Sequence, residues 1–459
     1  MRKILPALAC ALVMLVAAPS LAPRPAAARQ SDADRYLADE IFMLKAIDNH
    51  AHPLRVTREG EADREYDALV PDVLEPPPLP ARLRPDNPQY VGAWRDLWNY
   101  RHTDMSEAHV REVAAARARV ARERGEGYPA WVLDRLNIDV MLANRVVMGR
   151  GLAERRFLWV PFADALILPL STARVRKANP DYAAFYPGED ALLQRYFSML
   201  ADGAVHVREP KLPEALPANL RGYVGLVDLI LGVLRSRGAV AVKFEAAYLR
   251  GLDFGDATEA EAARVYARYA RGRGAPTAGE YKPLQDYLFR HVAREAGRLG
   301  LAVHVHTGAG IGGYFNLAGS NPALLEPALN DPDLRKTNFV LVHGGWPFDR
   351  QTGVLILKPN VYADFSAQTF LRTPHALAAT LRGWLEFAPE KVLFGTDAFA
   401  MTPEVGWEEV GWLSNRTARE ALAIALTGML RDGDITRERA SQIARMVMRD
   451  NAASLYGIK

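Results

Sequence analysis

Six side chains that could ligate a metal stand at the ends of four short apolar runs in this 459-residue chain. They are His50, His52, His304, His306, His343 and Asp397. Side chains two residues apart on a β-strand point to the same face, so each His-x-His pair can direct two imidazoles toward one point. The chain has 10 histidines, and five of them gather at three such places. This concentration favours a shared chemical task over isolated histidines of the core.

The residue types narrow that task to metal chemistry. Neutral imidazole nitrogens and a carboxylate oxygen together suit zinc with an open coordination position, and manganese or iron is an alternative. A cation held in this way lowers the pKa of bound water to about 7 and so supplies hydroxide at neutral pH. A thiolate ligand is not expected, because the only cysteine, Cys10, lies within an N-terminal apolar run.

The apolar runs that carry these residues are predicted to be β-strands. Eight strands are predicted, at Lys45–His50, Asp139–Ala143, Phe157–Pro161, Ala239–Phe244, Leu301–His306, Asn338–His343, Asn360–Phe365 and Lys391–Thr396. Helical patterns lie between the later strands, as in Leu284–Leu299 and Ala376–Phe387. Strands that alternate with helices pair in parallel, so we expect an α/β protein with a (β/α)8 TIM barrel. Catalytic residues of such a barrel lie at the C-terminal ends of its strands.

Two connections are much longer than the others. One follows the first strand and spans about 54–136, and the other follows the third strand and spans about 163–238. Long loops in a compact domain are usually functional, and both should emerge at the catalytic mouth. The segment Arg437–Lys459 is predicted to be a closing helix. The barrel domain with these two insertions should span 29–459.

The N-terminus has the pattern of a secretory signal peptide, predicted at 1–28. Arg2 and Lys3 precede an apolar run from Ile4 to Ala18, and three alanines at 26–28 supply small residues for cleavage. We therefore expect a secreted or periplasmic protein without stable membrane association after cleavage. The net charge of +3 and the absence of a Lys/Arg block argue against nucleic-acid binding. The expected partner is a small-molecule substrate, and a homo-oligomer stays open.

The motifs also resemble a known family. The chain is similar to the amidohydrolase superfamily, whose pattern is His-x-His on strand one, Lys or Glu on strand four, His on strands five and six, and Asp on strand eight. Within it, the chain resembles the amidohydrolase-related group that includes aminocarboxymuconate semialdehyde decarboxylase, and the amidohydrolase domains fused to glutamine-synthetase-like enzymes. The segments that carry this resemblance are 46–53, 242–252, His306-Thr307-Gly308, His343-Gly344-Gly345-Trp346-Pro347, Asp397-Ala398 and 450–456. The resemblance is weak across 54–238.

The resemblance implies a role for each matching residue. His50, His52, His306 and Asp397 would bind the metal, and Asp397 would also transfer protons. His343 would bind a second metal or polarise the scissile carbonyl, and Lys243 would be either a carboxylated ligand bridging two metals or an ammonium for an anionic substrate. One ion is favoured over two. The predicted substrate-binding residues are Tyr248, Arg250, His304 and Trp346, each with a packing role as the alternative.

Three functions fit this set of residues. The leading one is metal-dependent hydrolysis of a C–N or C–O bond in a small, carboxylate-bearing substrate. The alternative is a metal-dependent decarboxylase of an unsaturated or aromatic acid, since the same ligands serve both reactions. A catalytically silent binding protein is the third, and the intact ligand set argues against it.

The export signal gives the first prediction. Mass spectrometry of the protein from its native cell should find the mature N-terminus near Arg29 or Gln30, because the small residues end at Ala28. An intact Met1 in the soluble fraction would contradict it.

Overall fold

The computed structural model describes residues 33–459 apart from 59, 70–73, 75–78, 202–215, 271 and 273. Residues 33–459 form one compact unit. The predicted signal peptide lies outside the described residues, so its cleavage stays a prediction. No helix in the described part of the chain has both the length and the apolarity that crossing a membrane requires.

Parallel strands form the centre of this unit. They are β1 (Ala46–Ala51), β2 (Ile138–Asn144), β3 (Phe157–Val160), β4 (Ala241–Phe244), β5 (Ala302–His306), β6 (Phe339–Val342), β7 (Val361–Asp364) and β8 (Val392–Leu393). β1 to β3 form one sheet and β4 to β8 a second, each in sequence order, and all pairs are parallel. Each predicted strand is confirmed in position. β8 is shorter than predicted, because regular pairing with β7 ends at Leu393.

Backbone hydrogen bonds also join the two sheets at both of their edges. Trp159 and Phe162 form parallel bridges with Ala239 and Lys243 on the β3–β4 side. On the other side, Asn49 N donates to Phe394 O at 2.9 Å. The segment that follows β8 therefore stays beside β1 although it is no longer a regular strand.

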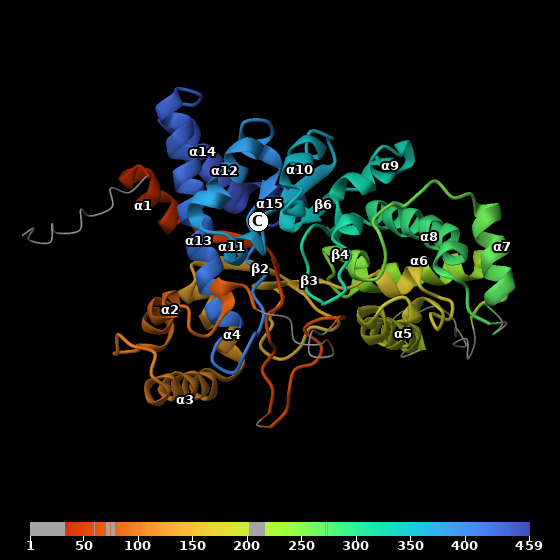
Figure 1. The fold of residues 1–459 in the computed structure, drawn as a ribbon, viewed down its shortest axis with the longest axis horizontal. Coiled ribbons are helices and arrows are strands. Elements are labelled where there is room, and N and C mark those ends of the chain that lie inside the picture. The colour runs from red at the N-terminus through yellow and green to blue at the C-terminus, as the bar shows by residue number, and fades with distance from the viewer. Residues whose placement is uncertain are drawn as a thin grey trace, which may run out of the picture. The chain divides into compact units, whose positions relative to one another are not determined.

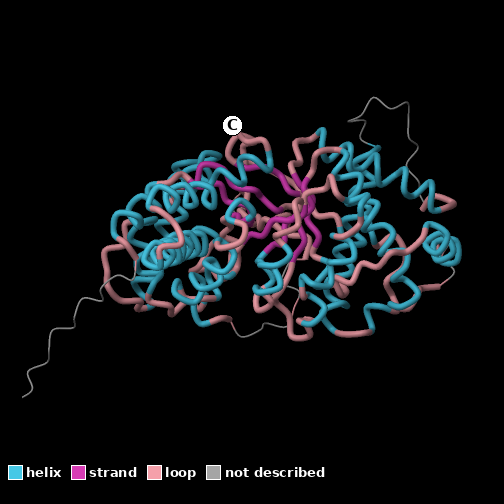
Figure 2. The backbone as a smooth tube through the Cα atoms, turned by 90° about the horizontal axis from the view of Figure 1, so that it is seen from above, coloured by secondary structure: helices cyan, strands magenta, loops and turns pink. Residues whose placement is uncertain are grey.

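Helices surround the strands, which lie in the interior in Figure 2. They are α1 (Arg35–Met43), α2 (Gln89–Trp98), α3 (Glu107–Arg124), α4 (Tyr128–Arg135), α5 (Pro180–Ala201), α6 (Leu220–Ser236), α7 (Glu259–Tyr269), α8 (Ala278–Arg298), α9 (Glu326–Leu329), α10 (Asp349–Leu355), α11 (Gln368–Leu371), α12 (Pro374–Leu385), α13 (Trp407–Asp432), α14 (Arg437–Arg445) and α15 (Asn451–Tyr456). The two helical patterns predicted from the sequence correspond to α8 and α12. The predicted closing helix is interrupted by a π-helical stretch, Met446–Asp450.

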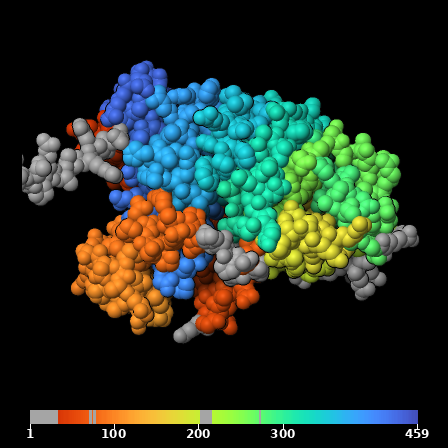
Figure 3. Space-filling view, viewed as in Figure 1, coloured from red at the N-terminus to blue at the C-terminus, as the bar shows by residue number. Residues whose placement is uncertain are grey.

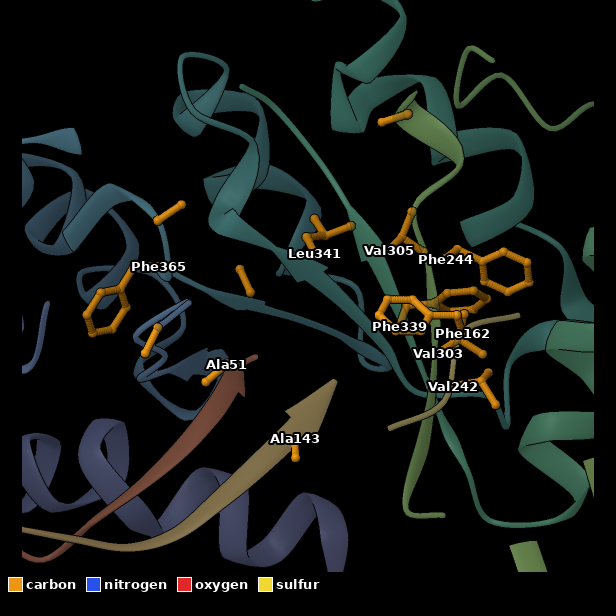
Figure 4. Packing of buried hydrophobic residues seen from close by; sticks show 14 of the residues in the cluster. Ala51, Ala143, Phe162, Val242, Phe244, Val303, Val305, Phe339, Leu341 and Phe365 are labelled. Atoms are coloured by element: carbon orange, nitrogen blue, oxygen red, sulfur yellow. The ribbon is translucent and has the colours of Figure 1, made fainter. Parts of the chain in front are cut away.

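The strands alternate between two apolar environments, as the period of two requires. Val303, Val305 and Leu341 belong to the large core shared with the helices, which Figure 4 shows on β4 to β6. Ala302, Val340 and Val342 belong to a second, smaller core, the inner core, which is formed mainly by strand residues. The C-terminal helix α15 packs against this inner core through residues that include Leu455 and Tyr456.

The connection after β1 contributes helices that are fastened to α13. Trp98 Nε1 at the end of α2 donates to Glu409 Oε1 at 2.7 Å, and Tyr128 OH donates to Glu408 Oε1 at 2.5 Å. Both carboxyl groups are buried, so these bonds satisfy groups that burial would otherwise leave without water. Figures 1 and 3 show this segment in orange below α13, at the surface. The connection after β3 contributes α5 and α6.

Candidate metal centre

Three of the expected ligands meet at one point. Nε2 of His50 lies 3.2 Å and Nε2 of His52 lies 3.6 Å from the same carboxylate oxygen, Oδ1 of Asp397. One donor atom from each residue lies within 4.8 Å of the others. The two imidazoles come from the end of β1 and the carboxylate follows β8, so the first and last strands together build this cluster.

Backbone bonds fix this meeting of the first and last strands. Asp397 N donates to His50 O at 2.7 Å, and His52 N donates to Ala398 O at 2.8 Å. Asp397 itself has a positive φ of 54°, a conformation that is uncommon for residues other than glycine. Just before it, Thr396 donates from its backbone N and its Oγ1 to the two oxygens of buried Asp48. Asp48 thus anchors the turn that presents Asp397. Burial raises the pKa of Asp48 to about 7.

Residues from the first long connection orient His52. Its Nδ1 lies 3.1 Å from Tyr66 O and 3.2 Å from Oδ2 of Asp67. A proton on Nδ1 donated to these oxygens leaves Nε2 free as a ligand, which is the usual arrangement for a metal-binding histidine. Asp67 was not predicted from the sequence. No sequence pattern marks it, because its contact with His52 forms only when the chain folds.

His306 and His343 form the neighbouring part of the site. Their ring centroids lie 4.5 Å apart, and the His343 ring lies 5.0 Å from that of His50. His306 is therefore adjacent to the three-residue cluster but is not part of it in this geometry. Nδ1 of His343 lies 2.8 Å from Ser366 Oγ and 3.9 Å from Oδ2 of Asp397. Ser366 Oγ in turn donates to Oδ1 of Asp364 at 2.5 Å.

Burial and a buried lysine keep these imidazoles neutral. Desolvation lowers the pKa of His50, His306 and His343 well below the ordinary value, and the positive charge of Lys243 lowers each of them further. Neutral imidazole is the form that binds a metal. Burial acts in the opposite direction on Asp397 and raises its pKa, while Lys243 opposes that rise.

Lys243 lies on β4 among buried acids. Its Nζ is buried, is 3.7 Å from Oε1 of Glu245 and makes no hydrogen bond with the described residues. Glu245 and Asp164 are also buried, and desolvation raises the pKa of both carboxyl groups, that of Asp164 to about 7. Glu189 of α5 is a further buried acid whose pKa is raised by desolvation. The cluster therefore mixes one ammonium with carboxyl groups that favour their neutral form.

The donor atoms fit a divalent cation. Nε2 of His50 and Nε2 of His306 are fully buried and have no hydrogen-bond partner among the described residues. Buried polar atoms are rarely left in this state, because the loss of water then has no compensation. A divalent metal bound by these two nitrogens and a nearby carboxylate oxygen would give the nitrogens the partner that they lack.

The predicted substrate-binding residues have different surroundings. The Tyr248 ring packs on His306 at 4.5 Å between centroids and also contacts Phe185 and Phe315, so it forms an aromatic wall beside the histidines. Trp346 is half-buried, and its carbonyl accepts from Ala309 N at 2.6 Å. A Cβ on Gly308 would lie 2.3 Å from that carbonyl. Close approach of two loops therefore explains this glycine.

Arg250 and His304 form hydrogen bonds with other side chains of the protein. Arg250 donates to Oδ1 of Asp286 at 2.8 Å and to Gln285, and its guanidinium lies over the Phe254 ring. These bonds give it a structural role and do not support the expected contact with a substrate carboxylate. Nε2 of His304 lies 2.8 Å from Tyr456 OH, and burial lowers its pKa to about 3. The packing alternative accounts for both residues.

His304 belongs to a hydrogen-bonded chain that reaches the site. Tyr456 OH donates to Oδ1 of Asn49 at 2.5 Å, and Nδ2 of Asn49 donates to Oδ2 of Asp364 at 2.7 Å. Asp364 accepts from His343 N at 2.9 Å and, as described above, from Ser366. The chain thus links α15, β1 and β7 to the backbone and ring of His343.

Comparison with known proteins gives the same family as the motifs. Residues 237–458 match the family model described as amidohydrolase. Protein fluG of Emericella nidulans is 29% identical over 239 residues, which are 50% of this chain and 27% of that protein. The chain therefore spans about a quarter of the length of the curated relative that it matches.

Solved structures share the fold at low identity. A protein of Lactobacillus casei assigned as a metal-dependent hydrolase is 16% identical, with a TM-score of 0.57 over 92% of this chain and 97% of that chain. Glucuronate isomerase of Caulobacter crescentus is 13% identical, with a TM-score of 0.60 over 94% and 96%. Uronate isomerase of Thermotoga maritima is 15% identical, with a TM-score of 0.55 over 93% and 98%. Residues 237–458, which carry Lys243, His306, His343 and Asp397, are therefore similar to the amidohydrolase family.

Proposed function

We propose that this protein is a metal-dependent hydrolase that cleaves a C–N or C–O bond in a small, carboxylate-bearing substrate. The observation that carries the proposal is the meeting of two imidazoles and one carboxylate at the ends of β1 and β8, next to buried nitrogens without a partner. The similarity of residues 237–458 to the amidohydrolase family supports an enzyme.

The proposal includes a closed eight-stranded barrel with the site at its mouth. The bridges between β3 and β4 and the backbone bonds from β1 to the segment after β8 support closure. The inner apolar core takes residues from both sheets, as a closed barrel requires. In such a barrel the C-terminal ends of the strands carry the catalytic groups.

His50, His52 and Asp397 would hold the cation, with His306 as the fourth ligand. Zinc suits this donor set, with manganese or iron as alternatives, and when bound the ion would polarise a carbonyl oxygen and lower the pKa of water at the site. The surrounding residues have separate tasks. Asp397 accepts the proton of the attacking water and passes it to the leaving group.

The remaining groups position the substrate. His343, held by Ser366, directs its ring toward the space between Asp397 and His306 and can stabilise charge on the scissile carbonyl. Lys243 brings a positive charge that would attract a substrate carboxylate. Tyr248 and the half-buried Trp346 would form the walls that exclude water.

One observation favours the decarboxylase alternative. The aromatic wall of Phe185, Tyr248 and Phe315 lies directly against His306. A flat, unsaturated acid stacks well on such rings. Release of carbon dioxide from aromatic acids, without hydrolysis of lactones, esters or N-acyl amino acids, would establish this alternative in place of hydrolysis.

The direct test combines a substrate screen with Asp397→Asn. The purified protein should hydrolyse members of a panel of lactones, esters and N-acyl amino acids, and chelation should abolish that activity until zinc or manganese is added. In Asp397→Asn we expect metal to be partly retained while turnover falls by about 10²-fold or more, because the base is lost. The matched control is Asp333→Asn, an exposed acid on another loop. Near-normal turnover in Asp397→Asn would place proton transfer elsewhere.

Asp67 gives a prediction about metal affinity. Asp67→Asn should weaken metal binding roughly 10- to 100-fold, because an amide no longer orients His52 and no longer strengthens its basicity. The affinity is measured by competition with a chromophoric chelator. Glu154→Gln, a change at an exposed loop residue, should leave the affinity unaltered. Equal affinities for Asp67→Asn and the unchanged protein would remove Asp67 from the site.

Lys243 decides how many metals the site holds. We expect about one ion per chain and activity that is independent of bicarbonate, because His50, His52 and Asp397 gather their donor atoms around one point and Nζ of Lys243 lies 3.7 Å from Oε1 of Glu245. Elemental analysis of the active protein measures the ratio. Two ions per chain, with a bicarbonate-dependent reconstitution that Lys243→Ala lacks, would instead indicate a carboxylated lysine that bridges two metals.

A further inference from the structure

A second group of metal-ligating side chains lies outside the active site, between α2 and α3. His102 is in the connecting loop, and His109 and Glu112 are three residues apart on α3, so both face the same side of that helix. One donor atom from each of the three lies within 4.8 Å of the others. Asp104 of the same loop contacts His109.

The distances within this group match those of a metal site. Nε2 of His102 lies 3.0 Å from Oε2 of Glu112. Two ligands of a tetrahedral zinc, each about 2.0–2.1 Å from the ion, are separated by about 3.3 Å. A small opening of this contact would therefore place an ion between the two atoms.

Asp104 holds His109 in the orientation that metal-binding histidines have. Nδ1 of His109 lies 2.8 Å and 3.1 Å from the two carboxylate oxygens of Asp104. A proton on Nδ1 shared with a carboxylate leaves Nε2 as the ligand atom. Asp104 is itself fixed, because its Oδ1 accepts from Ser106 N at 2.9 Å and its carbonyl accepts from Tyr100 OH at 2.8 Å.

The two imidazoles are packed face to face, with centroids 3.5 Å apart and planes inclined by 8°. An ion lies in the ring plane of an imidazole ligand, so one ring must turn for both to bind the same ion. Both side chains are about one-third exposed, 29% for His102 and 33% for His109. The turning ring therefore meets solvent on one side.

Charge also favours a cation at this place. Asp104 and Glu112 are two carboxylates, and within the described chain neither forms an ion pair with a lysine or arginine. A dication beside the two imidazoles would balance these two negative charges. Metal binding would stabilise the position of the loop, because His102 lies in the loop whereas His109 and Glu112 lie on α3.

We propose that His102, His109 and Glu112 form a separate zinc site that fastens the loop between α2 and α3 to the first turns of α3. It is a structural site in the first long connection, at the surface that Figure 3 shows in orange. It does not depend on the proposed hydrolase function, because it shares no residue with the cluster at the barrel mouth.

Zinc counting on the full chain tests the proposal. Metal-free protein is titrated with zinc alone, and the bound zinc per chain is measured by calorimetry and elemental analysis. We expect the unchanged protein to bind one more zinc per chain than His109→Ala at micromolar zinc. His375→Ala, a change at an exposed histidine of α12, is the matched control and should retain the full number. Glu112→Gln is a second variant that keeps the helix surface intact and should bind the extra zinc more weakly.

Thermal unfolding gives a second readout that does not depend on activity. Zinc should raise the Tm of the unchanged protein more than that of His109→Ala, since binding to the folded state stabilises it. Equal zinc numbers in the unchanged protein and in both variants would overturn the proposal. So would an extra zinc that appears only near millimolar concentration, which would be an adventitious ion only.

Discussion

The backbone hydrogen bonds between the first strand and the segment after the last one are the interaction on which the site depends. Asp397 N to His50 O and His52 N to Ala398 O bring together residues that are about 350 positions apart in the sequence. They also set which side chains of the two strands face inward together. Without these bonds, His50 and His52 could be correctly placed at the end of β1 and still lie too far from the carboxylate of Asp397 to form one cluster with it.

The second constraint is electrostatic. The site contains imidazoles, Lys243 and several acids, most of them buried, and each charge there must find a partner or lose its proton. Lys243 lowers the pKa of the surrounding histidines and opposes the rise in the pKa of Asp397. The long connections take part in this balance, because Asp67 comes from the first and Glu189 from the second.

Much of this arrangement could be predicted from the sequence. The features that could not be predicted depend on contacts that exist only in the folded protein. All eight strands and the convergence of His50, His52 and Asp397 follow from local apolar runs and the period of two. Asp67 was missed because its connection has no periodic pattern, and the contact that gives it a role exists only after folding. Arg250 was expected at the substrate because arginine suits carboxylates, but it binds Asp286. The π-helical stretch that divides the closing helix has no sequence signal that we can identify.

The chain of hydrogen bonds from Tyr456 to His343 links the order of synthesis to the order of assembly. Asn49, beside His50, is made 407 residues before Tyr456, so it has no Tyr456 to bind until α15 has been made. The inner core likewise lacks α15 until that moment. A chain that lacks α15 can therefore still pair its strands and bring the histidines together. The hydrogen-bonded chain that ends at the ring of His343 is complete only when α15 is present.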